Sequence, residues 1–151
     1  MQLSQKESSL LKDLKGQEKL CADKYEKHAS CAADPQLAEL FRRIAGIERQ
    51  HLETVTTMES GTVPPMSGGS PQNAPSFTAV YGVADTPEKQ ADCYLCSDVL
   101  ATEKHASSLY DTCIFEFKDA QARSALNHIQ KEEQEHGKMI YDYMAANAMY
   151  S

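Results

Sequence analysis

Apolar residues recur at alternating steps of three and four along four stretches of the chain, the spacing that turns one side of an α-helix toward a core. A helix-capping signal precedes each stretch: Ser4 with Glu7, Asp34 before Pro35, Thr86 before Pro87, and Asp119. We therefore predict helices near residues 4–32, 35–60, 87–118 and 120–146.

Residues 60–77, SGTVPPMSGGSPQNAPSF, are rich in Gly, Pro and Ser and cannot continue a helix. They fall between a first helical hairpin, residues 4–60, and a second, residues 87–146, which leaves residues 61–86 as a linker. The pattern predicts an all-α fold with a single domain over residues 1–151. Its architecture is a four-helix bundle made of two antiparallel helical hairpins joined by one long crossover.

A carboxylate interrupts the apolar stripe of each predicted helix near its middle. In the second and fourth helices a histidine follows that carboxylate three residues later, so both side chains lie on one face. The six residues are Glu18, Glu48, His51, Glu103, Glu133 and His136.

The two halves also repeat. Residues 18–51 align with residues 103–136 at a constant offset of 85, and 8 of the 34 aligned positions are identical. Because the identities include every inward glutamate and both histidines, we interpret the pattern as an internal repeat.

Four buried carboxylates are costly, since the penalty is several kcal/mol for each buried ion and like charges repel one another. Two divalent cations would offset both costs. Two Glu-x-x-His pairs facing two single glutamates form a mixed oxygen and nitrogen donor set that suits iron or manganese. We predict two metal ions held by the six residues, most simply iron, with manganese or a mixed iron and manganese pair as alternatives.

Tyr25 and Tyr110 each follow a predicted metal ligand by seven residues. They either donate hydrogen bonds to the ligand carboxylates or serve as ordinary core tyrosines, and the sequence leaves both interpretations open. His105 and His128 fall outside the apolar stripes and are expected at the surface.

The five cysteines form an odd number and are expected to be free thiols. Cys93 and Cys96 form a Cys-x-x-Cys pair inside a predicted helix, which favours small buried thiols over redox chemistry or half of a zinc site. An alternative stays open: if the first and third helices are antiparallel, His28 and Cys31 approach the same end of the bundle. A second metal site or a disulfide would then be feasible.

Acidic residues outnumber basic ones by 22 to 15, and the net charge of −7 argues against nucleic acid or an anionic membrane as the main partner. No apolar run approaches the roughly 20 residues that a membrane-spanning helix needs. The first residues, MQLSQKESSLL, have no signal-peptide core, so we expect a cytoplasmic protein.

Two family resemblances accompany these patterns. GQEKLCADKYEKHA followed by IERQH resembles the first half of rubrerythrin-like members of the ferritin-like superfamily. The second half, in EKHASSLY, IQKEEQEHG and the closing aromatic segment, resembles the spore-coat F family. Carried over position by position, the first resemblance implies a ferritin-like bundle with the same six metal ligands.

The chain also departs from both families. Rubrerythrins carry an additional glutamate where this chain has Ala106, and a rubredoxin domain that this sequence does not contain. Coat F proteins usually end with Trp before a final Tyr, where this chain has Met149.

Two functions follow. The leading one is a ferritin-like dimetal carboxylate protein, most simply a di-iron protein, that reacts with oxygen or peroxide as a peroxidase-type or ferroxidase-type oxidoreductase. The alternative is a structural spore-coat protein in which metal is absent or only stabilising. The sequence leaves open whether the protein is an enzyme. We expect a homodimer in the cytoplasm, or in the spore coat beside other coat proteins if the host forms spores.

Overall fold

The computed structural model describes residues 1–66 and 74–150, and the regular elements in these ranges are four helices. They are α1 (Gln5–Cys31), α2 (Pro35–Glu59), α3 (Pro87–Glu116) and α4 (Ala120–Ala146). The predicted all-α bundle is confirmed, with helix ends within two residues of the predicted ones. The Gly- and Pro-rich segment is non-helical at residues 60–66 and 74–77, and its residues 67–73 lie outside the described ranges.

Each helix begins at its predicted cap. The Ser4 hydroxyl accepts a hydrogen bond from the Glu7 N–H (3.1 Å), and the Glu7 carboxylate accepts one from the Ser4 N–H (2.7 Å). The side chains of Asp34, Thr86 and Asp119 accept from backbone N–H groups in the first turns of α2, α3 and α4. These bonds satisfy donors that a helix cannot pair internally.

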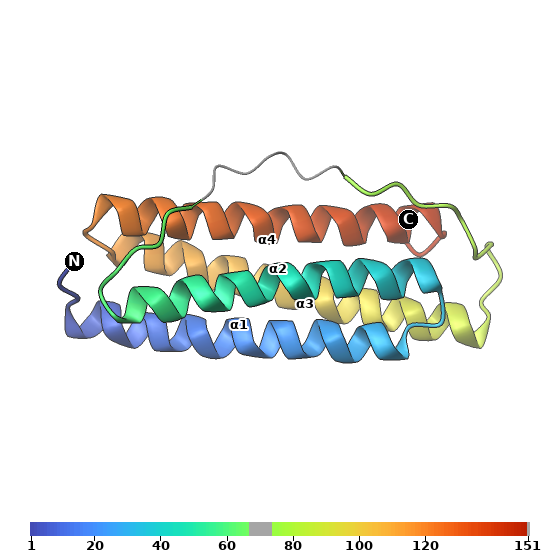
Figure 1. Ribbon diagram of the computed structural model, residues 1–151. Coiled ribbons are helices and arrows are strands. Elements are labelled where there is room, and N and C mark those ends of the chain that lie inside the picture. Colours follow the sequence, from blue (N-terminus) through green and yellow to red (C-terminus); the bar gives the residue numbers. More distant parts are fainter. Residues whose placement is uncertain (67–73, 151) are drawn as a thin grey trace.

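Helices α1 and α2 form one antiparallel hairpin and α3 and α4 form the other. Helix α2 ends at one end of the bundle and α3 begins at the other, so the linker connects opposite ends (Figure 1). Hydrogen bonds from Tyr25 to Glu103 and from Tyr110 to Glu18 show that α1 also packs antiparallel to α3. At the offset of 85, Tyr25 corresponds to Tyr110 and Glu18 corresponds to Glu103, so the two bonds are equivalent. The repeat in sequence is therefore also a repeat in contacts.

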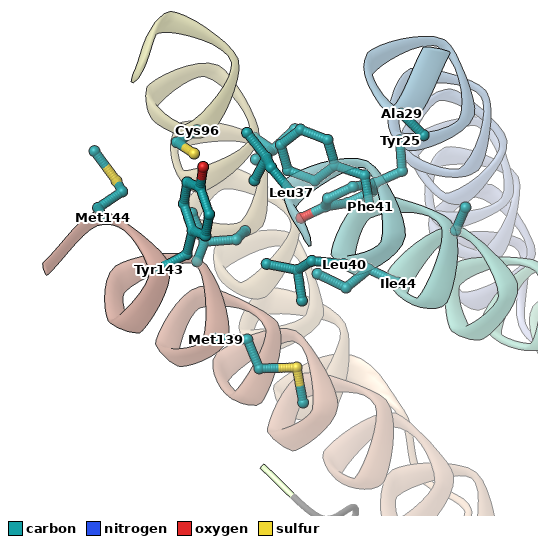
Figure 2. Packing of buried hydrophobic residues seen from close by; sticks show 13 residues of the cluster. Tyr25, Ala29, Leu37, Leu40, Phe41, Ile44, Cys96, Met139, Tyr143 and Met144 are labelled. Atoms are coloured by element: carbon teal, nitrogen blue, oxygen red, sulfur yellow. The ribbon is translucent and has the colours of Figure 1, made fainter. Parts of the chain in front are cut away.

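The core contains two apolar clusters separated by a polar layer. One cluster, near the end where α1 meets α2, includes Tyr25, Phe41, Ile44, Ile140 and Tyr143 (Figure 2). The other, toward the opposite end, includes Leu11, Leu14, Val55, Leu126 and Ile129. The inward carboxylates and histidines fall between these two clusters along every helix.

Asp92 connects three segments by hydrogen bonds at one end of the bundle. Its fully buried carboxylate accepts hydrogen bonds from the backbone N–H groups of Ala33 (2.8 Å) and Asp34 (2.9 Å) and from the Tyr81 hydroxyl (2.8 Å). The buried Asn147 side chain accepts a further bond from the Tyr81 N–H (3.1 Å). The α1–α2 turn and the last part of the linker are therefore both tied to the second hairpin.

Across the described residues, each helix is too polar to supply the continuous apolar span that a bilayer crossing requires.

Candidate metal centre

The six predicted ligands meet at the centre of the bundle. Each comes from the middle of its helix, where packing against the neighbouring helices removes it from solvent, and each residue is at most 2 % exposed. Helix α1 supplies Glu18, α2 supplies Glu48 and His51, α3 supplies Glu103, and α4 supplies Glu133 and His136.

The six form two overlapping groups of four, and within each group one donor atom from every residue lies within 4.8 Å of the others. The first group contains Glu18, Glu48, His51 and Glu133. The second contains Glu48, Glu103, Glu133 and His136. Glu48 and Glu133 belong to both groups, so their carboxylates are the two that could bridge a pair of ions.

The two histidines turn the same ring nitrogen into this layer. His51 Nδ1 lies 2.9 Å from Glu133 Oε1, and His136 Nδ1 lies 2.9 Å from Glu48 Oε1. Each histidine thus reaches the glutamate of the opposite hairpin. The two rings are stacked, with their centroids 5.9 Å apart.

Two buried tyrosines hold the glutamates that belong to one group only. The Tyr25 hydroxyl donates to Glu103 Oε1 (2.6 Å), and the Tyr110 hydroxyl donates to Glu18 Oε1. Both hydroxyls therefore lie where the first interpretation of these tyrosines requires, on carboxylates of the cluster.

Burial splits the carboxylates into two kinds. It raises the pKa of Glu18 to about 7 and raises the pKa of Glu103 well above its usual range, with repulsion from Glu133 adding to the second shift. Burial acts in the same direction on Glu48 and Glu133, but hydrogen bonds outweigh it. Bonds from the histidines lower the pKa of Glu48, and bonds from Glu103 and His136 lower the pKa of Glu133 to about 2.

The histidines respond to the same neighbours. Burial disfavours the charged imidazolium, but the surrounding carboxylates outweigh it and raise the pKa of His51 and of His136 well above the usual range. At a pH near 6 and without metal, these shifts favour ionised Glu48 and Glu133 beside two imidazolium rings, with Glu18 and Glu103 protonated. The charges of the six residues then sum to zero.

Several atoms of this layer lack a partner. Among the described residues, Glu18 Oε2, Glu103 Oε2, Glu133 Oε2 and His136 Nε2 are buried without a hydrogen bond. An unpaired buried polar group costs about 1–3 kcal/mol. Three carboxylate oxygens without a donor, each in a group that also offers a histidine nitrogen, fit divalent iron or manganese.

Glu132 was not predicted to take part. Its Oε1 lies 3.3 Å from His51 Nε2 and 2.9 Å from His128 Nε2. The side chain of His128 is 29 % exposed, so the prediction of a surface residue missed its role beside the cluster. The i, i+4 spacing of His128 and Glu132, directly before the inward Glu133, is the signal that could have found this pair. His105 is exposed, as predicted.

The alternative of a second metal site or a disulfide is wrong for the described residues. All five cysteines are free, and the groups of potential metal donors contain none of them. Although α1 and α3 are antiparallel, His28 Nε2 pairs with Asp98 instead, at 2.7 Å. Cys96 is buried as expected, while Cys93 is half-buried and Cys31 is exposed.

The chain was compared with known protein families, curated proteins and solved structures. Residues 91–151 match the Coat F domain, a range that begins in the second turn of α3 and includes all of α4. Neither the curated proteins nor the solved structures gave a match. The rubrerythrin-like resemblance of the first half lies outside the matched range and stays a prediction. The second hairpin, with Glu103, Glu133 and His136, is thus similar to the Coat F domain.

Proposed function

We propose that this protein is a spore-coat component of the Coat F type whose bundle holds two divalent metal ions at its centre. The observation that carries the metal proposal is the pair of overlapping buried donor groups that share Glu48 and Glu133. The match of residues 91–151 to the Coat F domain supports the location in the coat.

Each position combines shared and separate donors. Glu18 and His51 would complete one position, Glu103 and His136 the other, and the two shared carboxylates would serve both. The tyrosine hydroxyls orient Glu18 and Glu103, and the apolar clusters on either side keep water away. Because the donors come from all four helices, bound metal would stabilise the folded bundle by mass action.

A second candidate function is oxidoreduction. Each group offers four donor residues, fewer than the six ligands of octahedral coordination, which leaves room for a small oxidant. A ferrous pair bound here would supply two electrons, one from each iron as it becomes ferric, and with two protons from solvent these reduce one hydrogen peroxide to two water molecules. Turnover would then require an external reductant.

Metal analysis tests the leading proposal. Protein purified without chelators is expected to contain about two iron or manganese ions per chain, one for each donor group. The double variant Glu48→Ala/His51→Ala should lose metal. The matched control Glu39→Ala/His105→Ala removes the same residue types from exposed positions and should retain it. Metal-free protein that neither binds added Fe²⁺ or Mn²⁺ nor gains stability from them would overturn the proposal.

A turnover experiment distinguishes the two functions. Ferrous protein is mixed anaerobically with excess peroxide and a reductant, and peroxide consumption is followed. Consumption that stops after one peroxide per iron pair supports a structural role. Sustained consumption that disappears in Glu48→Ala/His51→Ala supports the oxidoreductase. In a spore-forming host, recovery of the tagged protein outside the coat fraction would contradict the proposed location.

A further inference from the structure

The two histidines of the centre differ in the nitrogen that faces away from it. His51 Nε2 lies 3.3 Å from the Glu132 carboxylate. His136 Nε2, its counterpart in the repeat, is buried without a hydrogen-bond partner among the described residues. The two halves of the centre therefore differ at the Nε2 atoms of their histidines.

The sequence explains this difference. At the offset of 85, the counterpart of Glu132 is Ile47, a buried apolar residue that can accept no hydrogen bond. Glu132 is also held in place from the surface side, because His128, one helical turn earlier, lies 2.9 Å from the same carboxylate oxygen. His51 thus has a carboxylate behind it that His136 lacks.

An outer carboxylate changes how well a histidine binds metal. When Nδ1 is the ligand, Nε2 carries the proton. A carboxylate that accepts a hydrogen bond from Nε2–H fixes the ring orientation and makes Nδ1 a stronger metal ligand. Loss of such a partner typically weakens metal binding by about 10–100-fold. The Nδ1 atoms of both histidines face the carboxylate layer, so this rule applies to each.

We propose that the two metal positions are unequal: the position of His51 binds its ion first and more tightly, with Glu132 as its positioning residue, and the position of His136 is the weaker, exchangeable one. This inference rests on the proposed metal pair. It adds an order of loading and names the residue that sets it.

A titration of the chelator-treated full chain with Mn²⁺ tests the order. Calorimetry measures the affinities, and electron paramagnetic resonance of the remaining free Mn²⁺ counts the bound ions. Two separate binding events are expected. His51→Ala should remove the tighter event and His136→Ala the weaker one, because each variant deletes the nitrogen donor of one position.

Glu132→Ala gives His51 the same unpartnered Nε2 as His136, so the tighter event should weaken by about 10–100-fold. Glu135→Ala is the matched control, since it removes a carboxylate three residues along the same helix and should leave both events unchanged. Ile47→Glu is the reciprocal variant and should tighten the weaker event. Circular dichroism checks that each variant folds. If Glu132→Ala does not fold, Glu132→Gln replaces it, because this variant keeps the shape of the side chain and removes its charge.

The results separate the two proposals. Two events of equal affinity, or a tight event that neither Glu132 variant weakens, would overturn the inequality while leaving the metal pair intact. A chain that binds no Mn²⁺ and no Fe²⁺ would overturn the proposed function itself. A tight event that survives in His51→Ala and disappears in His136→Ala would reverse the assigned order.

Discussion

Addition of metal to the metal-free protein should release protons in a number that the structure sets. In the absence of metal, Glu48 and Glu133 are ionised and their charges are balanced by the imidazolium forms of His51 and His136. Metal ligands bind in their deprotonated forms. Two divalent ions therefore cannot enter this neutral layer unless protons leave it.

The count comes from four groups. Burial raises the pKa of Glu18 to about 7 and the pKa of Glu103 well above its usual range, and the carboxylates raise the pKa of both histidines. At a pH near 6 all four groups hold a proton, so two ions should release about four protons. Because the bound form carries fewer protons, affinity rises with pH. The combined binding constant should increase about 10⁴-fold per pH unit below the pKa of Glu18.

The assay adds two equivalents of MnCl₂ to chelator-treated protein in a weakly buffered solution near pH 6, and a pH-stat measures the released acid. Calorimetry in two buffers with different ionisation enthalpies gives an independent count. Glu18→Ala/His51→Ala, which removes the two unshared donors of one position and two of the four protonated groups, should release about half as many protons. Release of fewer than two protons by the unaltered chain, or an affinity independent of pH, would refute the described charge state.

Three further outcomes are expected. The free energy of unfolding of the metal-free protein, measured in urea, should fall as pH rises from 5 to 8. Glu18 and Glu103 are protonated in the fold and ionise on unfolding, so the folded state holds more protons. A stability that rises with pH would contradict this. Asp92→Ala should lower the free energy of unfolding by about 3 kcal/mol, because it leaves the buried Asp34 N–H, the Ala33 N–H and the Tyr81 hydroxyl without this acceptor. The exposed control Asp111→Ala should change it by less than about 0.5 kcal/mol. Replacement of all six predicted donors by apolar residues should give a metal-free bundle at least as stable as the chelator-treated protein. A variant that does not fold would contradict this expectation.

The helices and the inward donors could be predicted because both depend on local patterns. Thr86 before Pro87 specifies a helix start by its own chemistry, and the donors stood out because Glu48 and His51 occupy positions where an apolar residue belongs. A constant spacing between the halves then aligned Glu48 with Glu133. None of these steps required knowledge of how the helices cross.

The contacts that were missed depend on that crossing. Glu132 lies beside the apolar stripe, and whether it reaches His51 depends on the angle and distance between α2 and α4. The partners of Tyr81 are likewise set by the path of the linker, since Asp92 is 11 residues away and Asn147 is 66 residues away along the chain. Helical periodicity carries no information on either.

The division of donors between the hairpins makes each hairpin half of a centre. The first supplies three donors of one group and needs Glu133 from the second; the second supplies three donors of the other group and needs Glu48 from the first. The Coat F-like range, residues 91–151, therefore contains three of the four donors of one group. A chain consisting of that hairpin alone could complete the position only in trans, by pairing with another copy about a twofold axis. In the present chain both hairpins belong to one polypeptide, so bringing the donors together does not depend on protein concentration.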